Sequence, residues 1–366
     1  MFNSKILSLD IGSKNTKIVL GTQSKKSVIV EKAITMVTPA GCYNDGNILD
    51  ITKFKDEILD VLEAENIKCK SIIITSKSTS VITRDIDIPV AKKEDMNSII
   101  KFQMERYLPI MFDDYIMQYK ILQEFEDEGV KKTRATVVVY PKIMAEGYYN
   151  LVRELKGNAV ALDISSNSIN KLFIEDIKVN GENYSLDDTV AVIDLGYDFI
   201  NVNIISNGNV EFTRIITYGG SHIDIDIANQ LTISEEESEK HKIKDCNLEM
   251  ESLGDMQSST VNDIAKAQVR TWTEEIERMI NYYKNKDQGN KVDKIYIYGG
   301  SSNLKGIETF LKDALNLPVS QIQSLSNVNC TKINASNADS FKTDSARIDE
   351  ELSKYLNAIG AIIRLR

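Results

Sequence analysis

Short runs in which apolar and polar residues alternate occur in two sets along the chain, and longer amphipathic stretches follow each set. Runs with a period of two predict strands, and stretches with a period of 3.6 predict helices. In the first half the predicted elements are strands over Lys5–Asp10, Thr16–Gly21 and Val28–Met36, a helix over Ile51–Glu65 and a strand over Lys70–Thr75. In the second half they are strands over Val190–Leu195, Phe199–Ser206 and Val210–Tyr218, helices over Ser221–Leu231, Ser234–Lys242 and Asn262–Lys286, a strand over Lys294–Tyr298 and a helix over Asn303–Leu315. Each half is therefore expected to form an α/β layer with a mixed sheet.

The two halves share a strand–turn–strand motif in the same register. The segments LDIGSKNTKIVL (Leu9–Leu20) and IDLGYDFINVNI (Ile193–Ile204) both carry Asp-x-Gly at the turn and alternating apolar residues after it. The alignment pairs Asp10 with Asp194 and Gly12 with Gly196. The repeat predicts a duplicated fold with two similar lobes.

A block of different design lies between the halves. Its predicted elements are a strand over Val81–Ile88, a helix over Lys93–Leu108 that Pro109 ends, strands over Tyr115–Leu122 and Thr133–Tyr140, a helix over Lys142–Leu155 and a strand over Ala159–Leu162. This β-α-β-β-α-β order predicts a compact inserted domain. The Asn-, Ser- and Thr-rich segment Asn327–Ser345 is expected to be a long loop or a poorly ordered excursion.

Composition narrows the class of function. The 366 residues are 42% hydrophobic and 27% charged, with a net charge of −10, which argues against a nucleic-acid-binding protein. The chain has no apolar run of bilayer length and starts without a signal-peptide pattern, so we expect a cytoplasmic protein whose membrane contact goes through partners. Four well-separated cysteines and two histidines show no metal-ligand spacing and leave little material for a histidine-based triad.

The first turn, Asp10 to Thr16, has the composition of a phosphate-binding loop. Gly12 permits a turn that brings backbone N–H groups close to a ligand, and the side chains after it add donors and one positive charge. These residues are Ser13, Lys14, Asn15 and Thr16. Asp10 ends the strand, where a carboxylate is placed to hold a hydrated Mg²⁺. An ordinary hairpin turn has the same pattern, so the motif alone leaves both interpretations open.

The second half offers further candidates for a purine nucleotide site. Asp194 and Gly196 are expected to contact the same ligand from the opposite lobe, with Asp194 as the second carboxylate near the metal. Two glycine pairs border predicted helices, where a flat base or a sugar can lie against the backbone: Gly219 with Gly220, and Gly299 with Gly300. Glu239 and Lys242 share one helix face and are candidates for the ribose, or form a solvent-exposed salt bridge with each other.

These features resemble the superfamily of actin, the heat-shock chaperones and the sugar kinases. Two segments of the inserted block narrow the likeness: RDIDIPVAKKEDMNSIIKFQMERYLPIMFDDYIMQYKIL (Arg84–Leu122) and VVVYPKIMAEGYYNLVRELKGNAVALDISS (Val137–Ser166). They resemble the PilM family of type IV pilus assembly proteins, in the branch that also contains the cell-division protein FtsA. The likeness covers the chain except Asn247–Ser259 and Asn327–Ser345.

The resemblance implies a duplicated actin-like (ribonuclease H-like) fold in two lobes. It divides the chain into a first-lobe subdomain (1–83), an inserted subdomain (84–165), a linking helix and connector (166–189) and the second lobe (190–345, helical at about 220–290). A C-terminal helix within 346–366 is expected to pack on the first lobe. Considered without the resemblance, the stretch Leu352–Ile363 is either core or a helix that lies on a membrane.

The resemblance also implies function. ATP with Mg²⁺ is expected between the lobes, contacted by the candidate residues named above, and the departures Tyr197 and Ile200 in the second turn predict slow or absent hydrolysis. A PilN-type membrane protein is expected to dock its short cytoplasmic N-terminal tail in a groove formed with the inserted domain. This interaction would link the chain, as a monomer or with weak self-association, to the pilus assembly platform and its motor ATPase at the inner face of the membrane.

The docking groove is the least specified feature. Tyr107, Leu108, Ile110 and Met111 follow one another at the end of the inserted helix and are candidates for it, or for an inter-domain core. Two other functions stay open: an FtsA-like filament-forming protein of cell division, and a sugar-kinase-like phosphotransferase. The second requires a carboxylate base beside an acceptor hydroxyl, and no segment resembles a sugar site.

Overall fold

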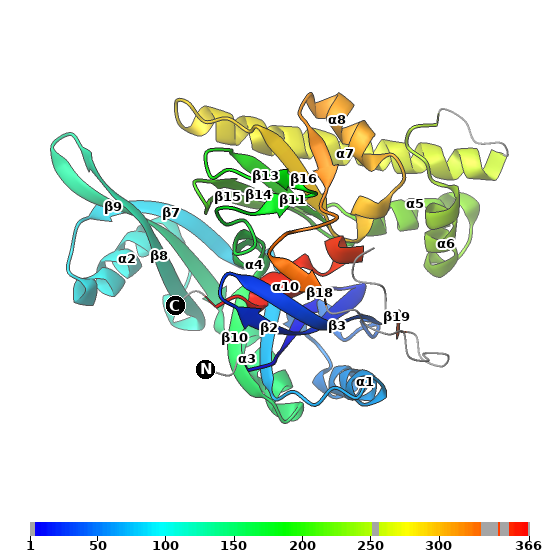
Figure 1. Cartoon of the computed structure of the whole chain (residues 1–366), viewed down its shortest axis with the longest axis horizontal. Coiled ribbons are helices and arrows are strands. Elements are labelled where there is room, and N and C mark those ends of the chain that lie inside the picture. The colour runs from blue at the N-terminus through cyan, green and yellow to red at the C-terminus, as the bar shows by residue number, and fades with distance from the viewer. Residues whose placement is uncertain (1–3, 251–255, 331–342, 345–350, 365–366) are drawn as a thin grey trace.

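Two mixed sheets form the body of the molecule (Figure 1). The structure is a computed structural model that describes residues 4–250, 256–330, 343–344 and 351–364. The first sheet has the order β10-β6-β1-β2-β3-β18, with β19 also paired to β3; its strands are β1 (Ile6–Ile11), β2 (Asn15–Ser24), β3 (Ser27–Val37), β6 (Ser71–Ser76), β10 (Asn158–Ile164), β18 (Val328–Cys330) and β19 (Thr343–Asp344). The second has the order β15-β14-β13-β16-β17; its strands are β13 (Val190–Leu195), β14 (Ile200–Ser206), β15 (Asn209–Ile216), β16 (Lys294–Tyr298) and β17 (Val319–Gln321).

The pairing of the strands repeats between the sheets. β1 runs antiparallel to β2 and parallel to β6, and β13 runs antiparallel to β14 and parallel to β16. Asp10 lies at the end of β1 and Asp194 at the corresponding place in β13, as the sequence repeat predicts. The hairpin between β14 and β15 turns at Asn207 and Gly208, whose φ angles of 50° and 72° fit the turn expected there.

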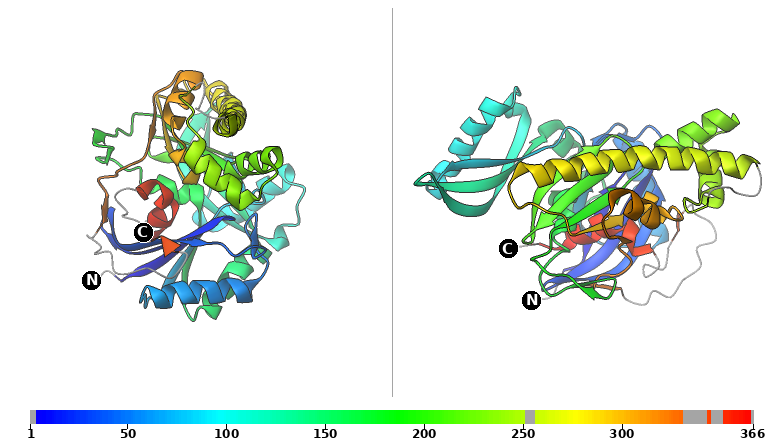
Figure 2. Two further views of the ribbon diagram at one scale, coloured as in Figure 1. Left: turned by 90° about the vertical axis from the view of Figure 1, so that its right-hand side faces the viewer. Right: turned by 90° about the horizontal axis from the view of Figure 1, so that it is seen from above.

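Three apolar cores hold these layers. The first sheet packs on α1 (Ile51–Ala64) and α3 (Lys142–Glu154), and the second on α5 (Gly220–Leu231), α7 (Met256–Lys286) and α8 (Ile307–Leu315), where Trp272 is fully buried. α6 (Glu235–Asp245) packs against α5 and α7 (Figure 2). The central core lies between the two sheets and contains residues of α4 (Ser165–Asn170) and α10 (Leu356–Ile362).

The C-terminal stretch belongs to the core. Every residue of α10 is buried, and a Cβ on Gly360 would lie 2.0 Å from the carbonyl oxygen of Ser168 in α4. The 3₁₀ turn η3 (Leu352–Lys354) leads into this helix. Of the two interpretations of Leu352–Ile363, the structure therefore supports the core. In the described part of the chain no helix is both long and apolar enough to cross a membrane.

The inserted block contains the predicted order of elements but divides between two layers. β7 (Ile82–Pro89), β9 (Val130–Pro141) and β8 (Tyr115–Asp127) form a separate sheet in that order, and α2 (Lys93–Tyr107) covers one of its faces. This unit projects from one end of the body (Figures 1 and 2). The last two elements, α3 and β10, instead join the first lobe, because α3 buries its apolar face in the core of that lobe and β10 pairs with β6.

Short elements complete the described part of the chain: the hairpins of β4 (Tyr43–Asn44) with β5 (Asn47–Ile48) and of β11 (Lys178–Val179) with β12 (Glu182–Asn183), and the 3₁₀ turns η1 (Phe112–Asp114) and η2 (Gly300–Asn303). The long loop expected over Asn327–Ser345 is wrong at its start, where β18 adds to the edge of β3. Residues 331–342 of that segment lie outside the described residues.

Candidate functional site

A cleft of about 510 Å³ separates the two lobes, and both Asp-x-Gly turns face it. Its lining from the first lobe includes Asp10 to Asn15, Lys17, Tyr43 and Lys77. From the second lobe and the C-terminal segment it includes Asp194, Gly196 to Phe199, Glu239, Lys242, Gly299 to Ser301 and Asn357. The structure therefore brings most of the predicted site residues together.

The first turn is a tight loop fixed by its own backbone. The Gly12 amide donates to the carbonyl oxygen of Asn15 (3.2 Å), and a Cβ on Gly12 would lie 2.9 Å from that oxygen. Thr38, just after β3, donates its hydroxyl to the Gly12 carbonyl (2.6 Å) and its amide to the Lys14 carbonyl (3.0 Å). The loop is thus preorganised before any ligand binds.

Thr16 is the exception among the residues predicted for this turn. Its side chain is fully buried, and its hydroxyl lies 2.9 Å from that of Thr38. The reason is the period of two along β2, which points Asn15 and Lys17 into the cleft and Thr16 away from it. The prediction that Thr16 contacts the ligand is corrected: the residue stabilises the turn, and Lys17 faces the cleft.

The second turn has the same hydrogen bond at the same place. The Gly196 amide donates to the carbonyl oxygen of Phe199 (3.1 Å). The Gly196 carbonyl then accepts from the Gly220 amide (3.1 Å) and the Ser301 hydroxyl (3.2 Å). The turn is therefore bonded to Gly220 of one glycine pair and to Ser301, which directly follows the other pair.

The glycine pairs have different roles from each other. A Cβ on Gly219 would lie 2.2 Å from the Tyr197 carbonyl oxygen, and neither Gly219 nor Gly220 lines the cleft. The pair permits close packing on the second turn, and its contact with the base or the sugar stays a prediction. Gly299 and Gly300 do line the cleft, and a Cβ on Gly300 would meet nothing within 4 Å, so ligand atoms have room there.

Two carboxylates and two ammonium groups meet between the turns. Lys17 lies opposite Asp10 in the β1–β2 register, and the Nζ of Lys77 lies 3.0 Å from Oδ2 of Asp194. The same oxygen accepts from Nδ2 of Asn357 (3.3 Å). Burial raises the pKa of Asp10 from its ordinary 3.8 to about 6, while Lys17 lowers it and Asp194 raises it. Burial likewise lowers the pKa of Lys17, and Asp10 opposes that shift.

Glu239 and Lys242 do not pair with each other, so the prediction of a shared solvent-exposed salt bridge is wrong. Oε2 of Glu239 lies 3.0 Å from Nζ of Lys14, across the cleft. Nζ of Lys242 lies 2.7 Å from the buried carboxylate of Asp224 on α5. Both side chains line the cleft, where Lys14 also lies 5.2 Å from the centre of the Tyr197 ring.

The contributors to the cleft that were missed in the sequence include the polar side chains Lys17, Lys77 and Asn357. Lys17 was signalled by its position two residues after Asn15 on the same strand face. Lys77 follows β6, whose parallel pairing with β1 places its end beside Asp10, so the strand order was required to find it. Asn357 comes from α10, far along the chain, and no local pattern marks it.

The predicted magnesium site does not fit these side chains. Mg²⁺ requires oxygen ligands in near-octahedral geometry, and neighbouring ammonium groups repel it. Asp194 already accepts from Lys77 and Asn357, and the two lysines balance the charge of Asp10 and Asp194. Within the described residues no group of three or more His, Cys, Asp or Glu is arranged to hold a metal ion.

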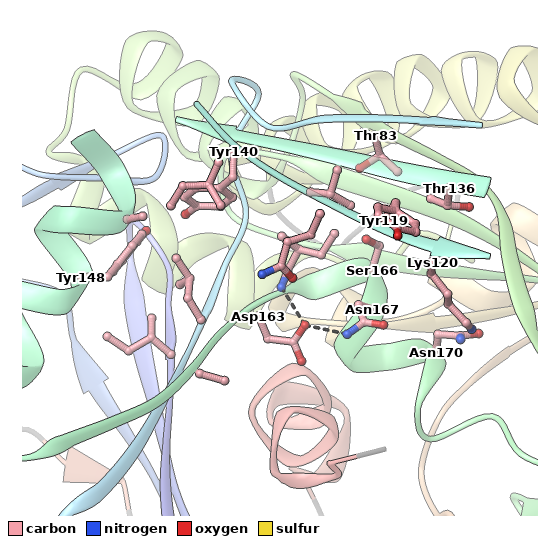
Figure 3. A pocket seen from close by; sticks show the side chains of 18 of the residues that line it. Thr83, Tyr119, Lys120, Thr136, Tyr140, Tyr148, Asp163, Ser166, Asn167 and Asn170 are labelled. Atoms are coloured by element: carbon pink, nitrogen blue, oxygen red, sulfur yellow. Dashed lines mark hydrogen bonds between the residues drawn. The ribbon is translucent and has the colours of Figure 1, made fainter. Parts of the chain in front are cut away.

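A second hollow, here called the groove, lies between the inserted sheet and the first lobe (Figure 3). It has a volume of about 520 Å³ and lies on the face of the inserted sheet opposite α2. Its walls are residues of β8, β9, α3, β10 and α4; the exposed apolar ones are Ile116, Tyr149, Val160 and Leu162. The signal in the sequence was TVVVY (Thr136–Tyr140), a run that is apolar on both faces of its strand.

The floor of the groove contains a fully paired carboxylate. Oδ1 of Asp163 accepts from the Ile164 amide (2.9 Å) and from Nδ2 of Asn167 (2.8 Å), as Figure 3 shows. Oδ2 accepts from Nζ of Lys171 (2.6 Å), which also donates to the Ile363 carbonyl oxygen just after α10 (2.8 Å). The groove is therefore joined to the same helix that supplies Asn357 to the cleft.

The four residues predicted for docking lie elsewhere. Leu108 and Ile110 pack against the core under α2, while Tyr107 and Met111 are exposed, Met111 by 77%. None of the four lines the groove. Arg84 lies over the Tyr107 ring, 5.0 Å from its centre. Their role in docking stays a prediction, separate from the groove.

The whole chain is similar to solved structures of one fold. A PilM–PilN type IV pilus biogenesis complex matches with a TM-score of 0.78 and 17% identity, covering 98% of this chain and 97% of that chain. The ethanolamine utilization protein EutJ from Carboxydothermus hydrogenoformans matches with 0.55 and 12%, covering 99% and 90%. MreB 5 of Spiroplasma citri bound to AMPPNP matches with 0.52 and 13%, covering 87% and 91%. These likenesses confirm the duplicated actin-like fold.

Comparison of the sequence with known protein families identifies the family of this chain. Residues 8–365 match the family of type IV pilus assembly protein PilM, which is nearly the whole chain. The two segments that carried the resemblance, from Arg84 to Leu122 and from Val137 to Ser166, lie within this match. The chain therefore belongs to the PilM family of type IV pilus assembly proteins.

Proposed function

We propose that this chain is a nucleotide-binding scaffold that docks the cytoplasmic N-terminal tail of a PilN-type membrane protein in the groove. The observation that carries the proposal is the groove itself, an apolar hollow of about 520 Å³ beside the inserted sheet. The solved structure of similar fold with a TM-score of 0.78 is a PilM–PilN complex, which makes a PilN-type tail the partner to test.

The groove has the chemistry for an extended peptide. β8 and β10 are edge strands of their sheets within the described residues, and both border the groove. An edge strand presents unpaired backbone groups to which a peptide adds as a further strand. The exposed side chains of Val160, Leu162 and Ile116 supply apolar contacts, and Gln118 and Asn167 supply hydrogen bonds.

The cleft supports binding of ATP. Two preorganised turns face each other, and backbone N–H groups in such turns suit phosphate oxygens. Ile243, exposed by 68%, and Leu304 offer an apolar surface for a base. The carboxylate of Glu239 also lines the cleft and can accept a hydrogen bond from a ribose hydroxyl. MreB 5, of similar fold, was solved with AMPPNP bound.

ATP in this proposal is retained rather than consumed. Ile200, aligned with Thr16 of the first turn, is buried in the core, and the bulky Tyr197 lines the cleft above Lys14. Ile200, like Thr16, points away from the cleft, so the support for slow or absent hydrolysis comes from the bulky Tyr197 side chain at the second turn, where the backbone would approach the phosphates. Release of phosphate from ATP at a rate typical of metabolic kinases would contradict it.

The remaining parts of the proposal concern the assembly. We place the chain at the inner face of the membrane, as a monomer or with weak self-association, bound through the PilN-type partner to the assembly platform and the motor ATPase. The net charge of −10 supports contact through a protein partner, because an anionic lipid surface repels it.

The experiment is equilibrium binding of a fluorescent PilN-type tail peptide to the full chain, measured by anisotropy. Leu162→Asp places a charge in the groove and is expected to weaken binding at least tenfold. Met111→Asp is the matched control, since Met111 is exposed at the end of α2 and lies outside the groove. If Met111→Asp weakens binding and Leu162→Asp does not, docking occurs at the predicted residues near Tyr107 and the groove proposal fails.

A further inference from the structure

In each of the two turns of the cleft, the ammonium group of a lysine lies close to the glycine of the Asp-x-Gly motif. A Cβ on Gly196 would lie 3.0 Å from Nζ of Lys77, so this ammonium group lies directly against the second turn. A Cβ on Gly12 would lie 3.9 Å from Nζ of Lys17, which places the second ammonium group at the first turn. Lys77 belongs to the first lobe and contacts the turn of the other lobe.

Asp194, one of the two carboxylates between the turns, has both of its oxygens against neighbouring groups. The side chains of Lys77 and Asp194 are 19% and 8% exposed, and Oδ2 of Asp194 accepts from both Lys77 and Asn357. Oδ1 lies against the backbone, since a Cβ on Gly299 would be 2.3 Å from it. Asp10 has the side chain of Lys17 across the β1–β2 ladder.

The charges decide between a metal ion and a polyphosphate. Asp10 and Asp194 carry two negative charges, and Lys17 and Lys77 carry two positive ones, so the group is neutral without an added cation. A magnesium ion placed among these ammonium groups is repelled at short range, and the Asp194 carboxylate is already paired with Lys77. A polyphosphate, in contrast, supplies oxygens that charge-assisted hydrogen bonds from lysine stabilise.

We propose that Lys77, together with Lys17, takes the place of a divalent cation in this cleft, so that a nucleoside triphosphate binds without magnesium. The inference rests on the proposed binding of nucleotide between the lobes. When the phosphates enter, Lys77 exchanges Asp194 for a phosphate oxygen, while Asp194 keeps its hydrogen bond from Asn357.

The test is calorimetric titration of the full chain with ATP, once in excess EDTA and once in excess Mg²⁺. The wild type is expected to bind with dissociation constants within about threefold of each other. Lys77→Met is expected to bind at least tenfold more weakly in EDTA, and Mg²⁺ is expected to restore part of the loss. Lys68→Met is the control, because it removes the same charge from an exposed site of the same lobe.

The outcomes of this titration distinguish magnesium-independent binding from nucleotide binding itself. Wild-type binding that is lost in EDTA and present in Mg²⁺ overturns the inference and leaves the nucleotide site standing. Absence of binding in both solutions, by a chain whose circular dichroism shows it to be folded, refutes the site and the inference together. Lys77→Arg keeps the charge and is expected to bind in EDTA; should Lys77→Met unfold, loss of EDTA binding in Lys77→Gln gives the same answer.

Discussion

Replacing Lys171 by methionine is expected to destabilise the protein more than most single substitutions. The side chains of Lys171 and Asp163 are only 4% and 8% exposed, and their charged atoms lie 2.6 Å apart. Lys171 also donates to the Ile363 carbonyl oxygen (2.8 Å), which connects α4 to the end of α10. Lys171→Met removes both interactions at once.

The loss in free energy of unfolding depends on the Asp163 carboxylate, which remains without its ion-pair partner. Breaking a buried ion pair costs roughly 3–5 kcal/mol, because the remaining charge stays buried without its partner. Asp163 keeps two hydrogen bonds, from Ile164 and Asn167, and borders the groove, where water can solvate it. The expected loss in free energy of unfolding is therefore near the lower end, about 3 kcal/mol, which is a large part of an ordinary protein's stability.

Urea unfolding followed by circular dichroism and by the fluorescence of Trp272 measures this loss. Trp272 is buried in the second lobe, so agreement of the two signals tests whether both lobes unfold together. The double variant Asp163→Asn/Lys171→Met is expected to recover most of the loss, since no unpaired charge remains. A loss below about 1 kcal/mol in Lys171→Met, or no recovery in the double variant, would refute this reasoning.

Three further predictions concern the cleft. Gly299→Ala is expected to cost about 1–3 kcal/mol in thermal unfolding, because φ is 93° and the new Cβ would lie 2.3 Å from Asp194; Gly181→Ala, with φ of 84° and open space, is expected to cost less. The Asp10 carboxyl is expected to titrate near pH 6 by ¹³C NMR. Since its pKa is raised above the ordinary 3.8, its contribution to stability is full below pH 4 and is lost as the pH rises through 6; a midpoint at or below 3.8 contradicts the described burial. Lys14→Ala removes a partly exposed pair with Glu239 and is expected to change stability by less than about 1 kcal/mol while weakening ATP binding.

The duplicated fold was predictable because its signals are local. Each strand of the repeat has its own period of two, and the Asp-x-Gly turns fix where the strands end. The family segments between Arg84 and Ser166 added the inserted block. The sequence did not show that α3 and β10 leave this block, because strand pairing with β6 is a contact between distant segments.

The site was predictable in part for the same reason. Residues near the turns were identified by motif, but the motif does not distinguish a ligand contact from a packing contact, which is why the buried Thr16 was assigned to the ligand. Lys77 and Asn357 enter the cleft through parallel pairing and through the C-terminal helix. Such contributions depend on how the segments assemble in space.

In the proposed function, one nucleotide is bound by both lobes at once. Hydrogen–deuterium exchange of the full chain, measured by mass spectrometry with and without ATP, tests it directly. The predicted result is slower exchange in peptides that contain Gly12 to Asn15 and, at the same ATP concentration, in peptides that contain Gly196 to Phe199 and Gly299 to Ser301. Unchanged exchange at both turns, or protection confined to one lobe, would contradict binding of one nucleotide by both lobes.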